Sequence, residues 1–226
     1  MSQRGFTLVE LLVVTAIVGV LMALLVGAVG AALREADSCT CMNQMRQIAI
    51  ATIQYARDND DALPRSTHSA MAYRAKPWGY ALCPYLAGGN YTGPGPAWDA
   101  MFNGIYRCPQ DARRNKWSYG KNVWFELTAG EILEIDGSNA GITYPSLSSI
   151  RRPSATILYG ELGSGSMADH IMAHFWYLGG SPEVDSKRHG TVSNYVFADG
   201  HGEAREFAST FDLKAHIDLW FPRRAR

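Results

Sequence analysis

The most constraining feature of the chain is an apolar run from Leu11 to Leu33, close to its N-terminus. Only Thr15 and three glycines interrupt these 23 residues. A helix that rises about 1.5 Å per residue would reach about 35 Å over this run, enough to cross a bilayer core of about 30 Å. The run is longer than the apolar part of a secretory signal peptide, usually about 7–15 residues, and no small-residue cleavage motif follows it directly. It therefore predicts a membrane-spanning helix.

An acidic residue, Glu10, stands at the edge of this run. A carboxylate costs about 2.5–3.5 kcal/mol at the middle of a membrane, and less near the interface. Glu10 therefore needs either water among the lipid headgroups or a partner of opposite charge. The residue alone leaves both explanations open.

The residues around Glu10 favour the second explanation. The sequence GFTLVELLVV, which begins at Gly5, resembles the N-terminal cleavage and methylation motif of type IV pilins and of the pseudopilins of type II secretion. The resemblance implies that a prepilin peptidase cuts after Gly5 and that the new N-terminal residue, Phe6, is methylated. It also implies that Glu10 meets the N-terminal amine of a neighbouring subunit, and that an inner-membrane assembly platform is a further partner.

The polar stretch after the apolar run keeps a helical period. Five side chains recur at the spacing of one helical face: Cys41, Met45, Ile48, Thr52 and Tyr55. Their spacing predicts an amphipathic helix with one buried stripe. No proline separates the two stretches, so we expect one helix over residues 6–58, ended by the acidic turn before Pro64. Residues 6–33 would lie in lipid or in a filament core, and residues 34–58 would pack on a domain.

The length of residues 59–226 predicts one globular domain. The resemblance at the N-terminus implies that residues 1–5 are a leader peptide. The stretch 65–122 is rich in Gly, Pro and aromatic residues, which favours loops with a short helix near Tyr80–Leu86 or Ala97–Asn103. Strand-like composition marks Val123–Leu127 and Ala155–Tyr159. The expected fold is therefore α+β, a long N-terminal helix packed on a small antiparallel sheet with long loops.

The clearest strand signal lies near the C-terminus. Residues 191–198 are β-rich, Asp199-Gly200 is a strong hairpin turn, and residues 201–207 return as the second strand. Nine residues separate His189 from this turn, a spacing that resembles the prepilin-associated domain named for His, nine residues and Asp-Gly. This sequence differs from that family at Glu161, where Asp is commoner, and at Gly202, where a hydrophobic residue is commoner.

The pair His189 and Asp199 has two interpretations. In an enzyme, His189 would act as a base oriented by Asp199 or Glu161. No Ser or Cys stands in a nucleophile motif, so we favour a structural role for His189, Asp199 and Gly200 and do not expect an enzyme. Some pseudopilins bind calcium near the C-terminal hairpin, so a Ca²⁺ site at Asp199 stays open; no other cofactor is expected and no metal ligands are assigned.

The four cysteines leave several pairings open. Cys39 and Cys41 would point away from each other on a helix, and the paired C-x-x-C spacing of many zinc sites is absent. We predict a disulfide between Cys41 and Cys108. A bridge from Cys39 or Cys41 to Cys83, and four free thiols, remain the alternatives.

The charge pattern limits the partners and the location. The net charge is zero and the pI is about 7, so nothing indicates nucleic-acid binding. Arg4 precedes the apolar run, and the charges just after it nearly cancel. The positive-inside rule therefore favours a single-pass inner-membrane protein with a cytoplasmic N-terminus and a periplasmic domain.

The predicted function is that of a structural subunit, which the resemblance implies. The subunit would be processed by prepilin peptidase and would join like or related subunits, through its N-terminal helix, in a type IV pilus-like filament or a type II secretion pseudopilus. The filament would be periplasmic or exposed at the cell surface. Two alternatives are a membrane-anchored extracytoplasmic binding module that uses the aromatic loops 73–106, and a hydrolase built around His189.

Overall fold

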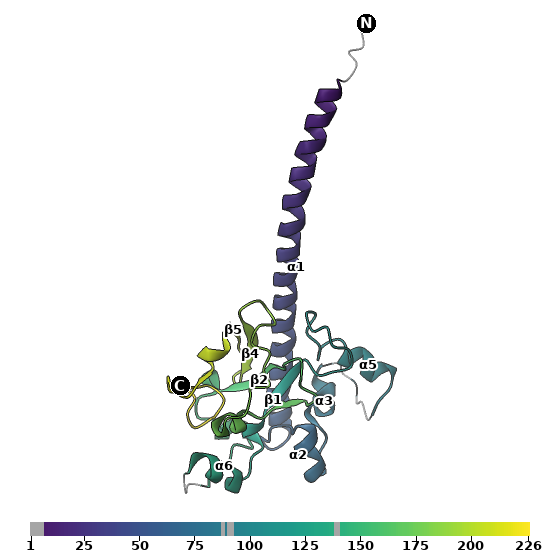
Figure 1. Cartoon of the computed structure of the whole chain (residues 1–226). Helices are drawn as coiled ribbons and strands as arrows, with labels where there is room; N and C mark the ends of the chain where they lie inside the picture. The colour runs from purple at the N-terminus through teal and green to yellow at the C-terminus, as the bar shows by residue number, and fades with distance from the viewer. Residues whose placement is uncertain (1–6, 87–88, 90–92, 138–140) are drawn as a thin grey trace.

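The computed structural model describes residues 7–86, 89, 93–137 and 141–226, so the predicted processing residues Gly5 and Phe6 lie outside it. A single helix, α1, runs from Leu8 to Asp58 over 51 residues. Its first half projects away from a globular head, and its second half is embedded in that head (Figure 1). This confirms the prediction of one long helix.

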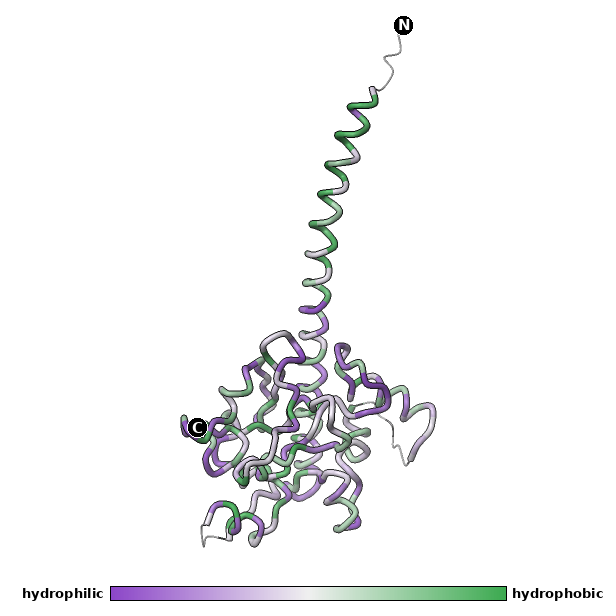
Figure 2. The backbone as a smooth tube through the Cα atoms, viewed as in Figure 1, coloured by the Kyte–Doolittle hydropathy of each residue, from purple (hydrophilic) through white to green (hydrophobic). Residues whose placement is uncertain are grey.

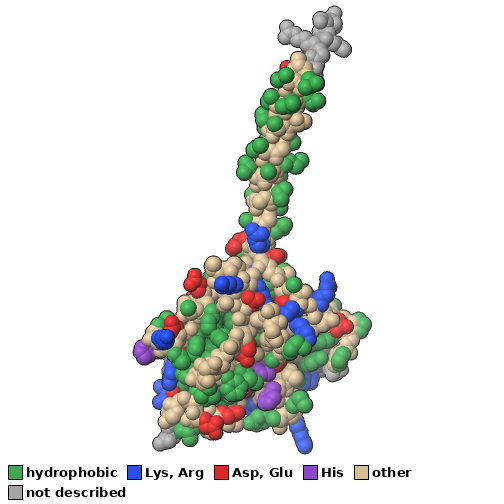
Figure 3. Space-filling model, viewed as in Figure 1, with side chains coloured by type: hydrophobic (Ala, Val, Ile, Leu, Met, Phe, Trp, Pro, Cys, Tyr) green, Lys and Arg blue, Asp and Glu red, His purple; other side chains and the backbone are tan. Residues whose placement is uncertain are grey.

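The two halves of α1 have opposite surroundings. Residues 8–29 are all exposed, and hydrophobic residues dominate this projecting part (Figures 2 and 3). In the described part of the chain, α1 is the one helix long and apolar enough to cross a membrane. Farther along, the predicted stripe is buried at Cys41, Met45, Ile48 and Thr52. The second half of α1 therefore buries this stripe in the head.

The head is built on a five-stranded sheet in the order β3-β1-β2-β4-β5. Its strands are β1 Tyr119–Asn122, β2 Ile157–Glu161, β3 His170–Ile171, β4 Ser193–Phe197 and β5 Gly202–Arg205. Neighbouring strands are antiparallel, except that β1 and β3 are parallel. A second sheet pairs β6 Phe211–Asp212 with β7 Ile217–Asp218. The expected α+β class, with a largely antiparallel sheet, is confirmed.

Short helices fill the long connections. The α-helices are α2 Thr67–Ala72, α3 Trp78–Ala81, α4 Cys83–Leu86, α5 Pro96–Phe102 and α6 Ala129–Asp136. The 3-10 helices are η1 Val123–Phe125, η2 Leu147–Ser149, η3 Pro153–Ala155, η4 Ala173–Leu178 and η5 Phe207–Ser209. Helices therefore form in both of the regions, Tyr80–Leu86 and Ala97–Asn103, where the sequence predicted a short helix.

One strand prediction was wrong. Residues Val123–Phe125 form a 3-10 helix, and the strand β1 precedes them. The reason is Asn122, whose side-chain Oδ1 accepts a hydrogen bond from the backbone N of Trp124 at 3.0 Å and caps the turn. The β-branched and aromatic composition of this segment serves burial rather than strand pairing.

The C-terminal hairpin matches its prediction. Strands β4 and β5 pair antiparallel, from Ser193 opposite Arg205 to Val196 opposite Gly202. The turn contains Gly200 at φ +92°, a conformation that glycine adopts without steric cost. The Asp-Gly signal in the sequence therefore located the turn correctly.

The sheet lies between α1 and a layer of C-terminal aromatic residues. Tyr159 and Glu161 on β2 face α1, where the Tyr159 hydroxyl lies 3.0 Å from Oγ1 of Thr52. Gly160 faces the other way, and a Cβ atom built on it would lie 2.8 Å from the ring of Trp220. This alternation is the two-residue period of a strand, and it directs Glu161 toward the helix.

Candidate functional site

The exposed end of α1 is organised by Thr7 and Glu10. The backbone N and the hydroxyl of Thr7 donate to Glu10 Oε2 at 2.8 and 2.7 Å, and the Glu10 backbone N donates to Thr7 Oγ1 at 3.2 Å. This reciprocal arrangement is a capping box, which satisfies free N–H groups at the helix start. The Thr-x-x-Glu spacing from Thr7 to Glu10 is the sequence signal for this cap. Glu10 Oε1 accepts no hydrogen bond from the described residues.

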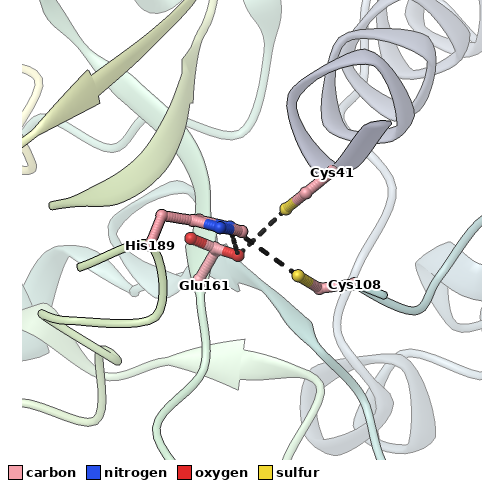
Figure 4. Close-up of side chains that lie close together, drawn as sticks. All are labelled: Cys41, Cys108, Glu161 and His189. Atoms are coloured by element: carbon pink, nitrogen blue, oxygen red, sulfur yellow. Dashed lines mark hydrogen bonds and ion pairs between the residues drawn. The ribbon is translucent and has the colours of Figure 1, made fainter. Parts of the chain in front are cut away.

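A second site lies where α1 meets the sheet. Four side chains from distant parts of the chain converge there: Cys41, Cys108, Glu161 and His189 (Figure 4). Cys41 comes from the buried face of α1, and Glu161 is the last residue of β2. Cys108 lies in the connection between α5 and β1, and His189 lies shortly before β4. One ligand atom from each residue lies within 4.8 Å of the other three.

Glu161 Oε1 is central to this cluster. It lies 2.9 Å from Cys41 Sγ and 3.0 Å from His189 Nε2, and His189 Nε2 lies 3.7 Å from Cys108 Sγ. The other carboxylate oxygen, Oε2, accepts hydrogen bonds from Ser193 Oγ at 2.9 Å and from the Asn194 backbone N at 2.7 Å. These two bonds fix the carboxylate and direct Oε1 at the two sulfurs and the imidazole.

The cluster is buried, and the cation Arg188 lies beside it. Cys41, Cys108 and Glu161 are fully buried. The side chain of His189 is 3 % exposed. The buried Arg188 guanidinium lies 3.9 Å from Glu161 Oε1 and also pairs with Asp185 at 3.1 Å. Positive charge from Arg188 therefore stabilises anionic groups in the cluster.

The environment separates the pKa values of these groups. Burial raises the pKa of the Cys41 thiol, whereas a hydrogen bond from Cys41, together with one from His189, lowers the pKa of Cys108 to about 6. Burial alone would lower the pKa of His189, but its bonds to Cys108 and Glu161 raise it to about 9. Burial would likewise raise the pKa of Glu161, but His189 and Arg188 outweigh it and lower that pKa. The site therefore favours anionic sulfur and carboxylate next to a cationic imidazole.

The predicted partners Cys41 and Cys108 lie together, as free thiols. The alternative partners are placed differently: Cys39 is exposed on α1, and the Cys83 thiol donates to the Gly79 carbonyl at 3.1 Å. The disulfide between Cys41 and Cys108 stays a prediction.

The structure does not bond His189 to the turn with which the sequence grouped it. The Asp199 carboxylate, about one-third exposed, accepts from His201, at 3.1 Å from the backbone N and 2.6 Å from Nδ1. His189 bonds Glu161 instead. Among the described residues, Asp199 belongs to no group of three or more metal-ligating side chains.

Comparison with known proteins identifies the N-terminal segment. Residues 1–32 match the family model described as the prokaryotic N-terminal methylation motif, which is typical of type IV pilins and pseudopilins. The chain thus carries the motif of a type IV pilin-like or pseudopilin precursor, and the projecting apolar helix fits a membrane-anchored protein of that kind. No curated protein and no solved structure matched the chain.

Proposed function

We propose that this protein is a structural subunit of a type IV pilus-like filament or a type II secretion pseudopilus, assembled through its N-terminal helix. The observation that carries the proposal is the methylation motif at residues 1–32, which overlaps a helix whose apolar half projects from the head. Prepilin peptidase would cut after Gly5, and Phe6 would become the methylated N-terminus.

The exposed apolar half of α1 supports assembly. Residues 8–33 would extend about 39 Å as a helix, and the structure describes nothing packed on residues 8–29. An apolar surface of this length needs lipid or other apolar helices around it. The helix would wait in the inner membrane and then leave lipid for a bundle of like or related helices, driven by the assembly platform.

Glu10 would set the register of that bundle. Its Oε2 is held by Thr7, while Oε1 is turned to no group in the described chain. A carboxylate inside an apolar bundle is costly unless a cation reaches it, and the methylated amine of a neighbouring Phe6 is such a cation. Only one stagger of two helices brings the amine and carboxylate together.

The proposed organisation follows from these roles. Residues 1–5 form the leader, residues 6–33 the membrane and filament-core segment, residues 34–58 the amphipathic continuation and residues 59–226 the head. The N-terminus would be cytoplasmic and the head periplasmic. This orientation agrees with the positive-inside rule, because Arg4 precedes the apolar run and the charges just after it nearly cancel. The role needs no catalytic site in the head.

Substitution of Glu10 tests the proposal. Glu10→Ala should leave membrane insertion intact and remove the protein from sheared filaments or from cross-linked pseudopilus fractions. Glu35→Ala, which removes an exposed carboxylate of the same helix beyond the apolar run, is the matched control and should assemble like the unmodified chain. Normal assembly of Glu10→Ala would contradict the proposal.

One surface favours a second candidate, the membrane-anchored binding module. A hollow of about 550 Å³ in the head is lined by Tyr80, Trp98, Phe102 and Trp117 together with polar Asp99 and Asn115. Tyr80 and Trp98 stack at 4.0 Å between ring centroids. Aromatic faces beside a few polar groups are typical of ligand sites, glycan sites included. Binding to a glycan array by the full chain, lost in Trp117→Ala, would support this candidate.

A further inference from the structure

The cluster of Cys41, Cys108, Glu161 and His189 has a composition typical of metal sites. Two thiols, one imidazole and one carboxylate supply four ligand atoms of the kinds that bind Zn²⁺ in proteins. The four come from α1, β2 and two connecting segments, so the fold itself assembles the set. The C-x-x-C spacing, absent from this chain, is not needed when ligands are gathered in this way.

The distances agree with a tetrahedral centre. Zinc bonds of about 2.0–2.3 Å place neighbouring ligands of a tetrahedron about 3.3–3.8 Å apart. The ligand atoms here lie between 2.9 Å (Cys41 Sγ to Glu161 Oε1) and at most 4.8 Å apart, with 3.7 Å from Cys108 Sγ to His189 Nε2. These distances differ from the tetrahedral range by at most about 1 Å.

The surroundings already orient the ligands. Ser193 and the Asn194 backbone hold Glu161 Oε2, so Oε1 alone faces the cluster. Outer bonds of this kind are a regular feature of metal sites, because they fix the direction of the ligand's lone pair. The buried His189 Nδ1 lacks a partner in the described chain, but a hollow of about 210 Å³ beside it, lined in part by Ser38 and Gln110, has room for a water that accepts its proton.

A positive charge lies beside the cluster as well. A divalent ion with two thiolates, one carboxylate and one neutral imidazole carries a net charge of −1. The Arg188 guanidinium, 3 % exposed and 3.9 Å from Glu161 Oε1, places a positive charge beside the site, which it shares with Asp111 at 3.5 Å and Asp185 at 3.1 Å. A buried charge is tolerated when it is paired in this way.

We infer that these four residues form a structural zinc-type site that fastens the assembly helix to the head. The cluster gives up two protons as the ion binds, so that both sulfurs coordinate as thiolates and His189 coordinates through Nε2 as a neutral imidazole. Protein atoms would fill all four coordination positions of the ion, and this is the arrangement of a structural rather than a catalytic zinc site. The same two thiols cannot serve as ligands while joined in a disulfide, so the predicted Cys41–Cys108 bridge is the competing state.

Metal analysis of the full-length protein tests the inference. The protein would be extracted from membranes in detergent, with free thiols alkylated in one portion to reveal disulfides. The other portion would be loaded with Zn²⁺, dialysed and analysed by mass spectrometry for metal content. We expect about one zinc per chain. Loading with Co²⁺ should give the visible and near-ultraviolet bands of a tetrahedral thiolate centre.

Variants locate the site. Cys108→Ser, Glu161→Gln and His189→Ala should each weaken zinc binding roughly tenfold or more. Cys83→Ser is the matched control, since it removes a buried thiol outside the cluster, and should keep one zinc per chain. If ligand variants fail to fold, the thiolate-to-cobalt bands of the unmodified protein still decide the question.

Three results would overturn the inference. They are a folded, reduced protein that retains no zinc or cobalt, a Cys41–Cys108 disulfide in the protein as isolated, and equal loss of zinc in Cys83→Ser and Cys108→Ser. The test does not depend on filament assembly, because it measures the purified subunit.

Discussion

Cys41 Sγ and Glu161 Oε1, 120 positions apart in the sequence, lie 2.9 Å apart and join α1 to the centre of the sheet. A second polar contact, 3.0 Å between Thr52 Oγ1 and the Tyr159 hydroxyl, lies farther along the same helix. Between them the buried stripe of α1 packs on β2 and β4. The second half of α1 and the head therefore form one unit, and a force on the helix would move the head with it.

Removal of zinc should destabilise the head. A ligand present at 100 times its dissociation constant adds about 2.7 kcal/mol to the free energy of unfolding. For a chain of this size, each kcal/mol raises the melting temperature by about 2–4 °C. A chelator should thus lower the melting temperature of the zinc-loaded, full-length protein by about 5–10 °C in calorimetry. The same chelator should leave Cys108→Ser unchanged; an equal drop in both would contradict zinc at this cluster.

Gly160 should not accept a side chain. A Cβ there would lie 2.8 Å from the Trp220 ring and 3.2 Å from Ile171 Cδ1, inside a closely packed layer. Overpacking of this kind usually costs about 1–3 kcal/mol, so Gly160→Ala should lower the free energy of unfolding by that amount. Gly165→Ala is the control, because nothing lies within 4 Å of its Cβ position. Tryptophan fluorescence during urea unfolding measures both.

Acid should weaken the buried pair of Lys121 and Glu126. Their charged atoms lie 2.7 Å apart, with the side chains 0 % and 4 % exposed. Burial would raise the pKa of Glu126, but Lys121 and the bonds from Ser66 outweigh it and lower that pKa. A lowered folded-state pKa means that the stabilisation is complete above the unfolded pKa of about 4.3 and is lost as pH falls through the folded value.

The Lys121–Glu126 pair has a clear mutational test. Glu126→Gln should cost about 3–5 kcal/mol at neutral pH, because it leaves a buried ammonium unpaired. It should also flatten the loss of stability below about pH 4.3. Adding Lys121→Met to Glu126→Gln should recover part of the loss. Unchanged acid sensitivity in Glu126→Gln, measured by urea unfolding across pH, would count against this account.

The long elements of the fold could be predicted from the sequence because each carries a local pattern. The apolar run and the helical spacing from Cys41 to Thr52 predicted α1, and Asp199-Gly200 predicted the hairpin. The prediction failed for the segment after Asn122. Its composition is typical of a strand, but the Asn122 side chain caps a 3-10 helix over these three residues.

The buried cluster could be predicted only in part. Its four residues lie at 41, 108, 161 and 189, and no local spacing joins such distant positions. The sequence predicts Cys41 and Cys108 as a pair, and it offers Glu161 as one of two carboxylates that could orient His189, a contact present at 3.0 Å. What the sequence could not supply was the register of β2 against β4, which places Glu161 beside Asn194 and turns its carboxylate toward α1.

The mass of the N-terminal peptide, taken from protein in its native membrane, tests the filament account most directly. A chain that begins at methylated Phe6 is the predicted result, because it requires cleavage after Gly5 by prepilin peptidase. A chain that still begins at Met1 or Ser2, in cells with an active prepilin peptidase, would contradict the account and leave a membrane-anchored binding module as the better explanation.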